Sequence, residues 1–84
     1  MRANREYRLL VSRGGRAPSL LADPDRTDSI EIVEVASGEV VLFWDCLPRE
    51  ASRMARALRA DLAQLEAEEF IARWSAVASP EQLG

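Results

Sequence analysis

The chain has 84 residues and a formal net charge of −3, with a single cysteine and no histidine. This composition excludes a disulfide within one chain and a zinc site built from Cys and His, because Cys46 has no such partner. A chain this short buries only about 60–65% of the surface that it exposes when unfolded, so its core is thin. We therefore expect a single domain over residues 1–84 that gains support from a second subunit.

The N-terminal residues 1–16 are rich in Arg and contain no apolar segment of the kind found in signal peptides. No segment approaches the ~18 consecutive apolar residues that span a membrane. Together with the lone cysteine, these features predict a cytoplasmic protein without membrane contact. Every basic residue is Arg, which points to a GC-rich genome. An Arg-rich patch is therefore weaker evidence of function here than in an average sequence.

The charges alternate along the chain. Residues 1–16 are basic, residues 23–45 are acidic and residues 49–61 are basic again. Such segments attract each other within one chain or between two copies. A general nucleic-acid binder has a dominant positive face instead, so this pattern disfavours that class of protein.

Three strands are predicted from apolar alternation. Residues 5–11 form the first strand, with Tyr7, Leu9 and Val11 on one face. Residues 12–29 contain Gly14-Gly15 and several Pro and Asp residues, and this composition predicts a long loop. Residues 30–36 and 39–45 form the second and third strands.

The second and third strands form a predicted hairpin with a two-residue turn at Ser37-Gly38. The alternation slips near Ile32-Val33, which indicates either a β-bulge or a strand covered on both faces. The third strand is the most apolar of the three, so we expect it to lie in the centre of the sheet with both faces covered.

A long helix is predicted to begin at Pro48, because proline is favoured at the first helical position. Its first half has one apolar stripe, and the stripe changes direction near Glu66. Two structures explain this change. The helix breaks near residues 66–68 and folds back, or one helix continues to about Val77 and projects from the sheet. The fold class in either case is α+β, a three-stranded antiparallel sheet packed by this helix, with a flexible tail at residues 79–84.

The apolar residues of the C-terminal half and one strand tryptophan are the main candidates for contacts with a partner, because a thin core cannot easily enclose them all. They are Phe70, Ile71, Trp74, Val77 and Trp44. A row of arginines on the first half of the helix is a second candidate, either for contacts to an anionic partner or as a solvated face. It consists of Arg49, Arg53, Arg56 and Arg59.

Other signals do not support a site. Cys46 precedes the helix, where a thiol can be reactive, but a small buried apolar role is the simpler interpretation. Asp23, Asp25 and Asp28 do not have the spacing of a calcium loop and fit a solvated turn. Gly14-Gly15 belongs to no phosphate-binding motif. We therefore predict no catalytic residue, metal site or cofactor.

The leading hypothesis is a non-catalytic, regulatory or accessory protein-interaction module. It forms a homodimer and binds another protein through the aromatic helix end or the open sheet face. One alternative is a transcriptional regulator that contacts nucleic acid through the Arg row and the basic N-terminal residues. Another is a small ligand carrier or enzyme subunit, which would need paired carboxylates that the spacing does not indicate.

Overall fold

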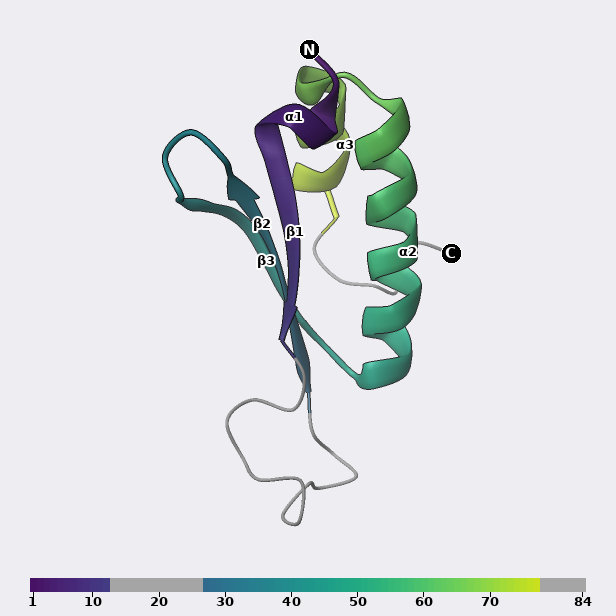
Figure 1. The fold of residues 1–84 in the computed structure, drawn as a ribbon. Helices are drawn as coiled ribbons and strands as arrows, with labels where there is room; N and C mark the ends of the chain where they lie inside the picture. The colour runs from purple at the N-terminus through teal and green to yellow at the C-terminus, as the bar shows by residue number, and fades with distance from the viewer. Residues whose placement is uncertain (13–26, 78–84) are drawn as a thin grey trace.

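The computed structural model describes residues 1–12 and 27–77. Three strands form one antiparallel sheet in the order β1-β2-β3, and both long helices lie on the same side of it (Figure 1). The elements in chain order are α1 (Ala3–Glu6), β1 (Tyr7–Ser12), β2 (Asp28–Glu34), β3 (Val40–Cys46), α2 (Pro48–Gln64) and α3 (Ala67–Ser75). This arrangement confirms the predicted α+β class and the helix that begins at Pro48. The predicted tail lies outside the described residues.

The first strand begins later than predicted, because residues 3–6 form the short helix α1. Tyr7, Leu9 and Val11 share the side that faces the helices, as the alternation predicts. Of the predicted loop, residues 13–26 lie outside the described part. Asp28 belongs to β2 and is buried, so its assignment to a solvated turn is wrong.

The central strand is β2, and the prediction that the third strand is central is wrong. β3 is an edge strand, and its residues Val41 and Phe43 are 40% and 53% exposed. Apolar residues on both faces of a strand usually indicate burial on both faces. In β3 one of these faces is instead left uncovered, so this strand departs from that rule.

The β2–β3 hairpin contains the predicted bulge but a longer turn. Ile32 pairs with Leu42 and Val33 pairs with Val40, so Val41 is the additional residue of a β-bulge. The Glu34 N–H donates to the Glu39 carbonyl at 2.8 Å, so residues 35–38 form a four-residue turn instead of the expected two-residue one. Gly38 has φ 75°, a conformation that glycine adopts without strain.

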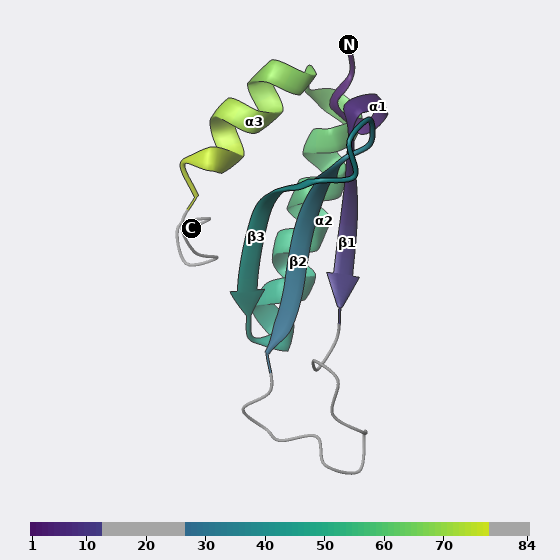
Figure 2. The ribbon, with the colours of Figure 1, turned by 90° about the vertical axis from the view of Figure 1, so that its left-hand side faces the viewer.

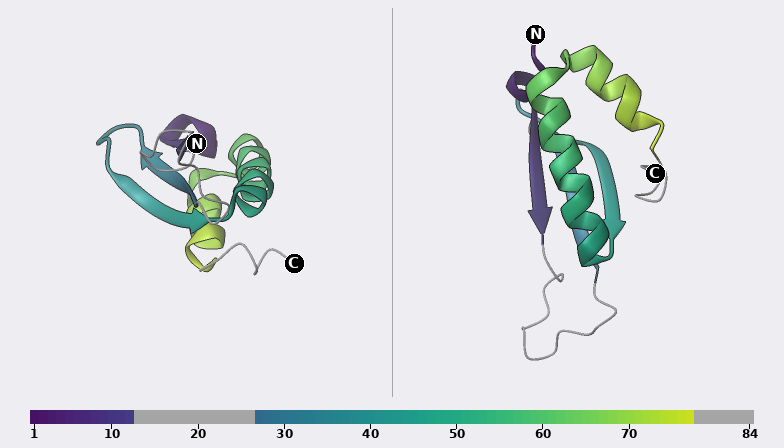
Figure 3. Two further views of the ribbon diagram at one scale, coloured as in Figure 1. Left: turned by 90° about the horizontal axis from the view of Figure 1, so that it is seen from below. Right: turned by 90° about the vertical axis from the view of Figure 1, so that its right-hand side faces the viewer.

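The helix breaks between Gln64 and Ala67, and the alternative of one projecting helix is wrong. The two residues between α2 and α3 are extended, and α3 turns back toward the sheet (Figure 3). The N-terminal segment forms hydrogen bonds with the backbone groups at this break. The Ala3 N–H donates to the Leu65 carbonyl and the Ala67 N–H donates to the Met1 carbonyl, both at 2.9 Å.

The core lies between the sheet and the helices. Ile30 and Ile32 from β2 meet Met54 and Leu58 from α2, and all four are fully buried. The aromatic residues of α3 complete this core, because Phe70 stacks on Tyr7 of β1 and Trp74 meets Trp44 of β3. All the helices therefore cover one side of the sheet, and its other side is free of helices within the described residues (Figure 2).

Candidate interaction surfaces

The aromatic residues predicted to bind a partner lie in the core. Phe70 and Trp74 are 0% and 1% exposed, and Trp44 is also buried. Trp74 donates from Nε1 to Asp61 Oδ2, and Trp44 donates from Nε1 to the Val77 carbonyl, both at 2.9 Å. The two indole rings meet edge to face with centroids 5.9 Å apart. These residues therefore attach α3 to the sheet and to α2.

The other two members of that group, Ile71 and Val77, are half-buried. All five residues were candidates because a thin core cannot easily enclose them, and a projecting helix would leave the four on the C-terminal half without a core. Since α3 folds back, that reason no longer applies, and we look for a partner surface elsewhere.

The uncovered side of the sheet exposes a group of apolar side chains. We define the open face by the outward-facing residues Arg8, Leu10, Glu31, Val33, Val40, Val41 and Phe43. Four of its apolar members, Leu10, Val40, Val41 and Phe43, are 40–53% exposed. Monomeric proteins seldom leave such residues next to each other on one surface, and a contiguous apolar patch marks an interaction site.

The strand register places two charges inside this patch. Leu10, Glu31 and Phe43 lie side by side across the three strands. Arg8, Val33 and Val40 form the next row. The carboxylate of Glu31 and the guanidinium of Arg8 therefore sit on the same face, one row and one strand apart. The sequence contains the signal for this face, because Phe43 and its neighbours make both sides of the third strand apolar.

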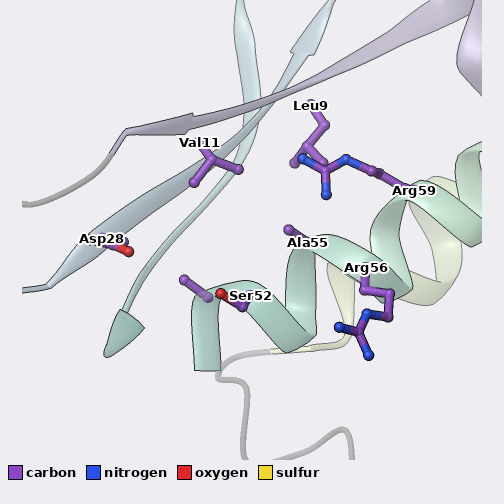
Figure 4. A pocket seen from close by; sticks show the side chains of 8 residues that line it. Leu9, Val11, Asp28, Ser52, Ala55, Arg56 and Arg59 are labelled. Atoms are coloured by element: carbon purple, nitrogen blue, oxygen red, sulfur yellow. The ribbon is translucent and has the colours of Figure 1, made fainter. Parts of the chain in front are cut away.

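The four predicted Arg contacts separate into two groups. Arg56 and Arg59 line a cleft between β1 and α2, whereas Arg49 and Arg53 do not. All four side chains are exposed, and none forms an ion pair with another residue within 1–12 or 27–77. Figure 4 shows the guanidinium of Arg59 extended toward Leu9 across the mouth of this cleft.

The cleft has a volume of about 530 Å³. Its apolar floor comes from inward-facing residues of β1 and from small residues of α2, and polar groups surround this floor. It is lined by Leu9, Val11, Asp28, Ala51, Ser52, Ala55, Arg56 and Arg59. A cleft with an apolar floor and two cationic groups is suited to a ligand that combines apolar and anionic groups.

Cys46 is the remaining reactive-residue candidate from the sequence. Cys46 is buried, and burial together with the nearby carboxylates of Glu50 and Asp45 raises the pKa of its thiol. It therefore fits the small buried apolar role. The described part contains no group of three or more potential metal ligands. None of its helices is both long and apolar enough to cross a membrane.

The chain has no match among the known proteins with which we compared it. No protein-family model, no curated protein and no solved structure in these comparisons matches it. The open face and the β1–α2 cleft are therefore the features from which a function can be argued.

Proposed function

We propose that this chain is a non-catalytic protein-interaction module that associates with a second copy of itself through the open face. The observation that carries the proposal is the exposure of Leu10, Val40, Val41 and Phe43 on a side of the sheet that no described helix covers. Two antiparallel sheets commonly bury such faces against each other at a separation of about 10 Å. A chain with a thin core gains stability from this burial.

The charges on the open face favour a second copy over an unrelated apolar surface. Consider a two-fold axis that lies in the interface, runs perpendicular to the strands and passes midway between the two rows. It brings the row of Glu31 against the row of Arg8 of the other copy. Phe43 then packs on Val40 of that copy. Glu31 is then offset by one strand from Arg8 of that copy, across the space between the two sheets. The arrangement is reciprocal, as a two-fold interface requires, so it forms each contact twice.

The size of the open face predicts a weak association. Three strands of seven residues or fewer present a sheet surface of roughly 300 Å². A stable interface buries about 800 Å² on each partner, so the sheet alone provides less than half of that area. We therefore expect a dimer that forms and dissociates rapidly, as suits a regulatory or accessory protein.

Sedimentation analysis over a wide range of protein concentration tests this proposal. The wild type is expected to change from monomer to dimer as its concentration rises. Phe43→Ser removes the largest apolar side chain of the open face and should keep the protein monomeric. Leu47→Ser is the matched control, because Leu47 is 50% exposed but lies between β3 and α2, outside the open face.

The control variant should associate like the wild type, and circular dichroism should show that both variants remain folded. A wild type that stays monomeric at every concentration would contradict the proposal. So would an equal effect of the two substitutions, because apolar exposure in general, and not the open face, would then drive the association.

A further inference from the structure

We infer that the cleft between β1 and α2 binds an extended, acidic segment of another protein, which adds to the edge of β1 as a fourth strand. This inference is independent of the proposed self-association, because the open face lies on the opposite side of the sheet. The two surfaces have no residue in common, so one can fail its test while the other passes.

The backbone of β1 is available for such pairing. The Val35 N–H donates to the Glu6 carbonyl at 2.9 Å, which makes Glu6 and Val35 a hydrogen-bonded pair in the β1–β2 ladder. Hydrogen-bonded and non-hydrogen-bonded pairs alternate along an antiparallel ladder. Leu9 and Val11 therefore belong to non-hydrogen-bonded pairs. Their N–H and C=O groups point away from β2, toward the edge that no described strand occupies.

The side chains at this edge are also incompletely covered. Leu9 and Val11 face the helices, yet both are only half-buried, and both line the cleft. An added strand would lie about 4.8 Å from β1, and alternate side chains of that strand would point into the cleft. Strand addition at a sheet edge obtains its affinity from the main chain and its specificity from such alternate side chains.

The charges at the cleft select the partner. Arg56 and Arg59 approach it from α2, and neither forms an ion pair with another described residue. The buried Asp28 lies at the end of the cleft away from Arg59 (Figure 4). We therefore expect a carboxylate of the partner at the arginine end and apolar side chains over Leu9 and Val11. Charge-assisted hydrogen bonds from guanidinium groups to carboxylates are among the strongest polar contacts in proteins.

A second copy of this chain fits the cleft poorly. Symmetric pairing of β1 with β1 would place the two α2 helices about three strand spacings apart, or ~14 Å, because α2 packs across all three strands. Arg56 and Arg59 of both copies would then face each other, and Asp28, the acidic residue among those that line the cleft, is buried. This repulsion favours an acidic segment of a different protein as the occupant.

Three blocked hexapeptides can test the inference by NMR titration of the labelled full-length chain. The probe has the sequence Thr-Val-Thr-Val-Thr-Glu, which places two apolar side chains two residues apart, as Leu9 and Val11 are, and the carboxylate beyond them on the same face. The second peptide has Lys in place of Glu. The third is the probe with N-methyl groups on alternate amides, which removes the hydrogen bonds of an added strand.

The double variant Arg56→Glu/Arg59→Glu reverses the charge at the cleft. The matched control is Arg49→Glu/Arg53→Glu, which makes the same charge change on the same helix away from the cleft. The probe should shift the amide signals of Leu9 and Val11. It should bind the cleft variant roughly tenfold more weakly or worse, and the control variant about as well as the wild type.

The N-methylated and Lys peptides should bind the wild type poorly, and the Lys peptide should bind the cleft variant better than the probe does. Failure of the probe to bind the wild type would overturn the inference. Equal binding of the N-methylated peptide would also overturn it, because an added strand requires those amides. Equal losses of affinity for the probe in the two double variants would show that net charge alone attracts it. That result would also overturn the inference.

Discussion

Glu66 holds the start of the chain against the break between α2 and α3. Its carboxylate lies 2.8 Å from the amino group of Met1, and Arg2 donates from Nη1 to the Gln64 carbonyl at 2.7 Å. The hydrogen bond and charge of the Met1 amine lower the pKa of Glu66 below its ordinary value of 4.5. The same contact raises the pKa of the amine above its ordinary value of 8.0.

These two shifts predict a window of pH in which the contact stabilises the fold. The contribution of Glu66 is present above its ordinary pKa and is lost as the pH falls through its lowered value. The contribution of the amine is present below its ordinary pKa and is lost as the pH rises through its raised value. Both groups are exposed, so the stabilisation is small and sensitive to salt.

Thermal unfolding of Glu66→Gln at several pH values tests this residue. The variant should melt below the wild type near neutral pH, and the two melting temperatures should converge at acidic and at strongly alkaline pH. Glu69→Gln is the control, because Glu69 is an exposed carboxylate in the first turn of the same helix. A difference between Glu66→Gln and the wild type that does not vary with pH would contradict the ion-pair explanation.

At the scale of elements, α3 is attached by two indoles and one carboxylate. Trp74 packs on Phe70 with ring centroids 6.4 Å apart and donates to Asp61, which Arg73 also approaches from Nε at 3.4 Å. Phe70 also stacks on Tyr7, with ring centroids 5.9 Å apart. These contacts make α3 part of the core.

Substitution of Trp74 tests whether α3 is part of the core. Trp74→Ala should lower the free energy of unfolding by about 3–5 kcal/mol, because it leaves a cavity between α3 and the sheet. Trp74→Phe keeps an aromatic ring and removes the donor to Asp61, so we expect a smaller loss of about 1–3 kcal/mol. Urea unfolding measures both values. Near-wild-type stability of Trp74→Ala would show that α3 contributes little to the core.

The sequence predicted those elements whose signals are local. Pro48 marks the start of α2, and the alternation of Tyr7, Leu9 and Val11 gives the inward side of β1. The helix break was left open because its backbone partners come from Met1 and Ala3, more than sixty residues away in the chain.

The position of the third strand could not be obtained from its own residues either. Its two apolar faces are compatible with burial in the centre of a sheet and with an exposed edge that binds a partner. The strand order decides between them, and that order depends on how β1 pairs with β2. The candidate surfaces are therefore visible in the sequence only as residues that do not fit a monomeric core.

At the scale of the whole molecule, the two sides of the sheet differ in what covers them. One side is covered by α2 and α3 and forms the core, and the other side presents the open face (Figures 1 and 2). In the proposed dimer, the open face packs on the open face of a second copy, with Arg8 of each copy beside Glu31 of the other.

A charge-exchange experiment tests this pairing of the two open faces. Arg8→Glu places two acidic residues beside each other in a dimer, and Glu31→Arg places two basic residues there, so each variant alone should sediment as a monomer. An equal mixture of the two variants should associate like the wild type, because every contact between unlike chains again joins opposite charges. A mixture that stays monomeric under conditions where the wild type dimerises would contradict the claim, as would either variant dimerising normally by itself.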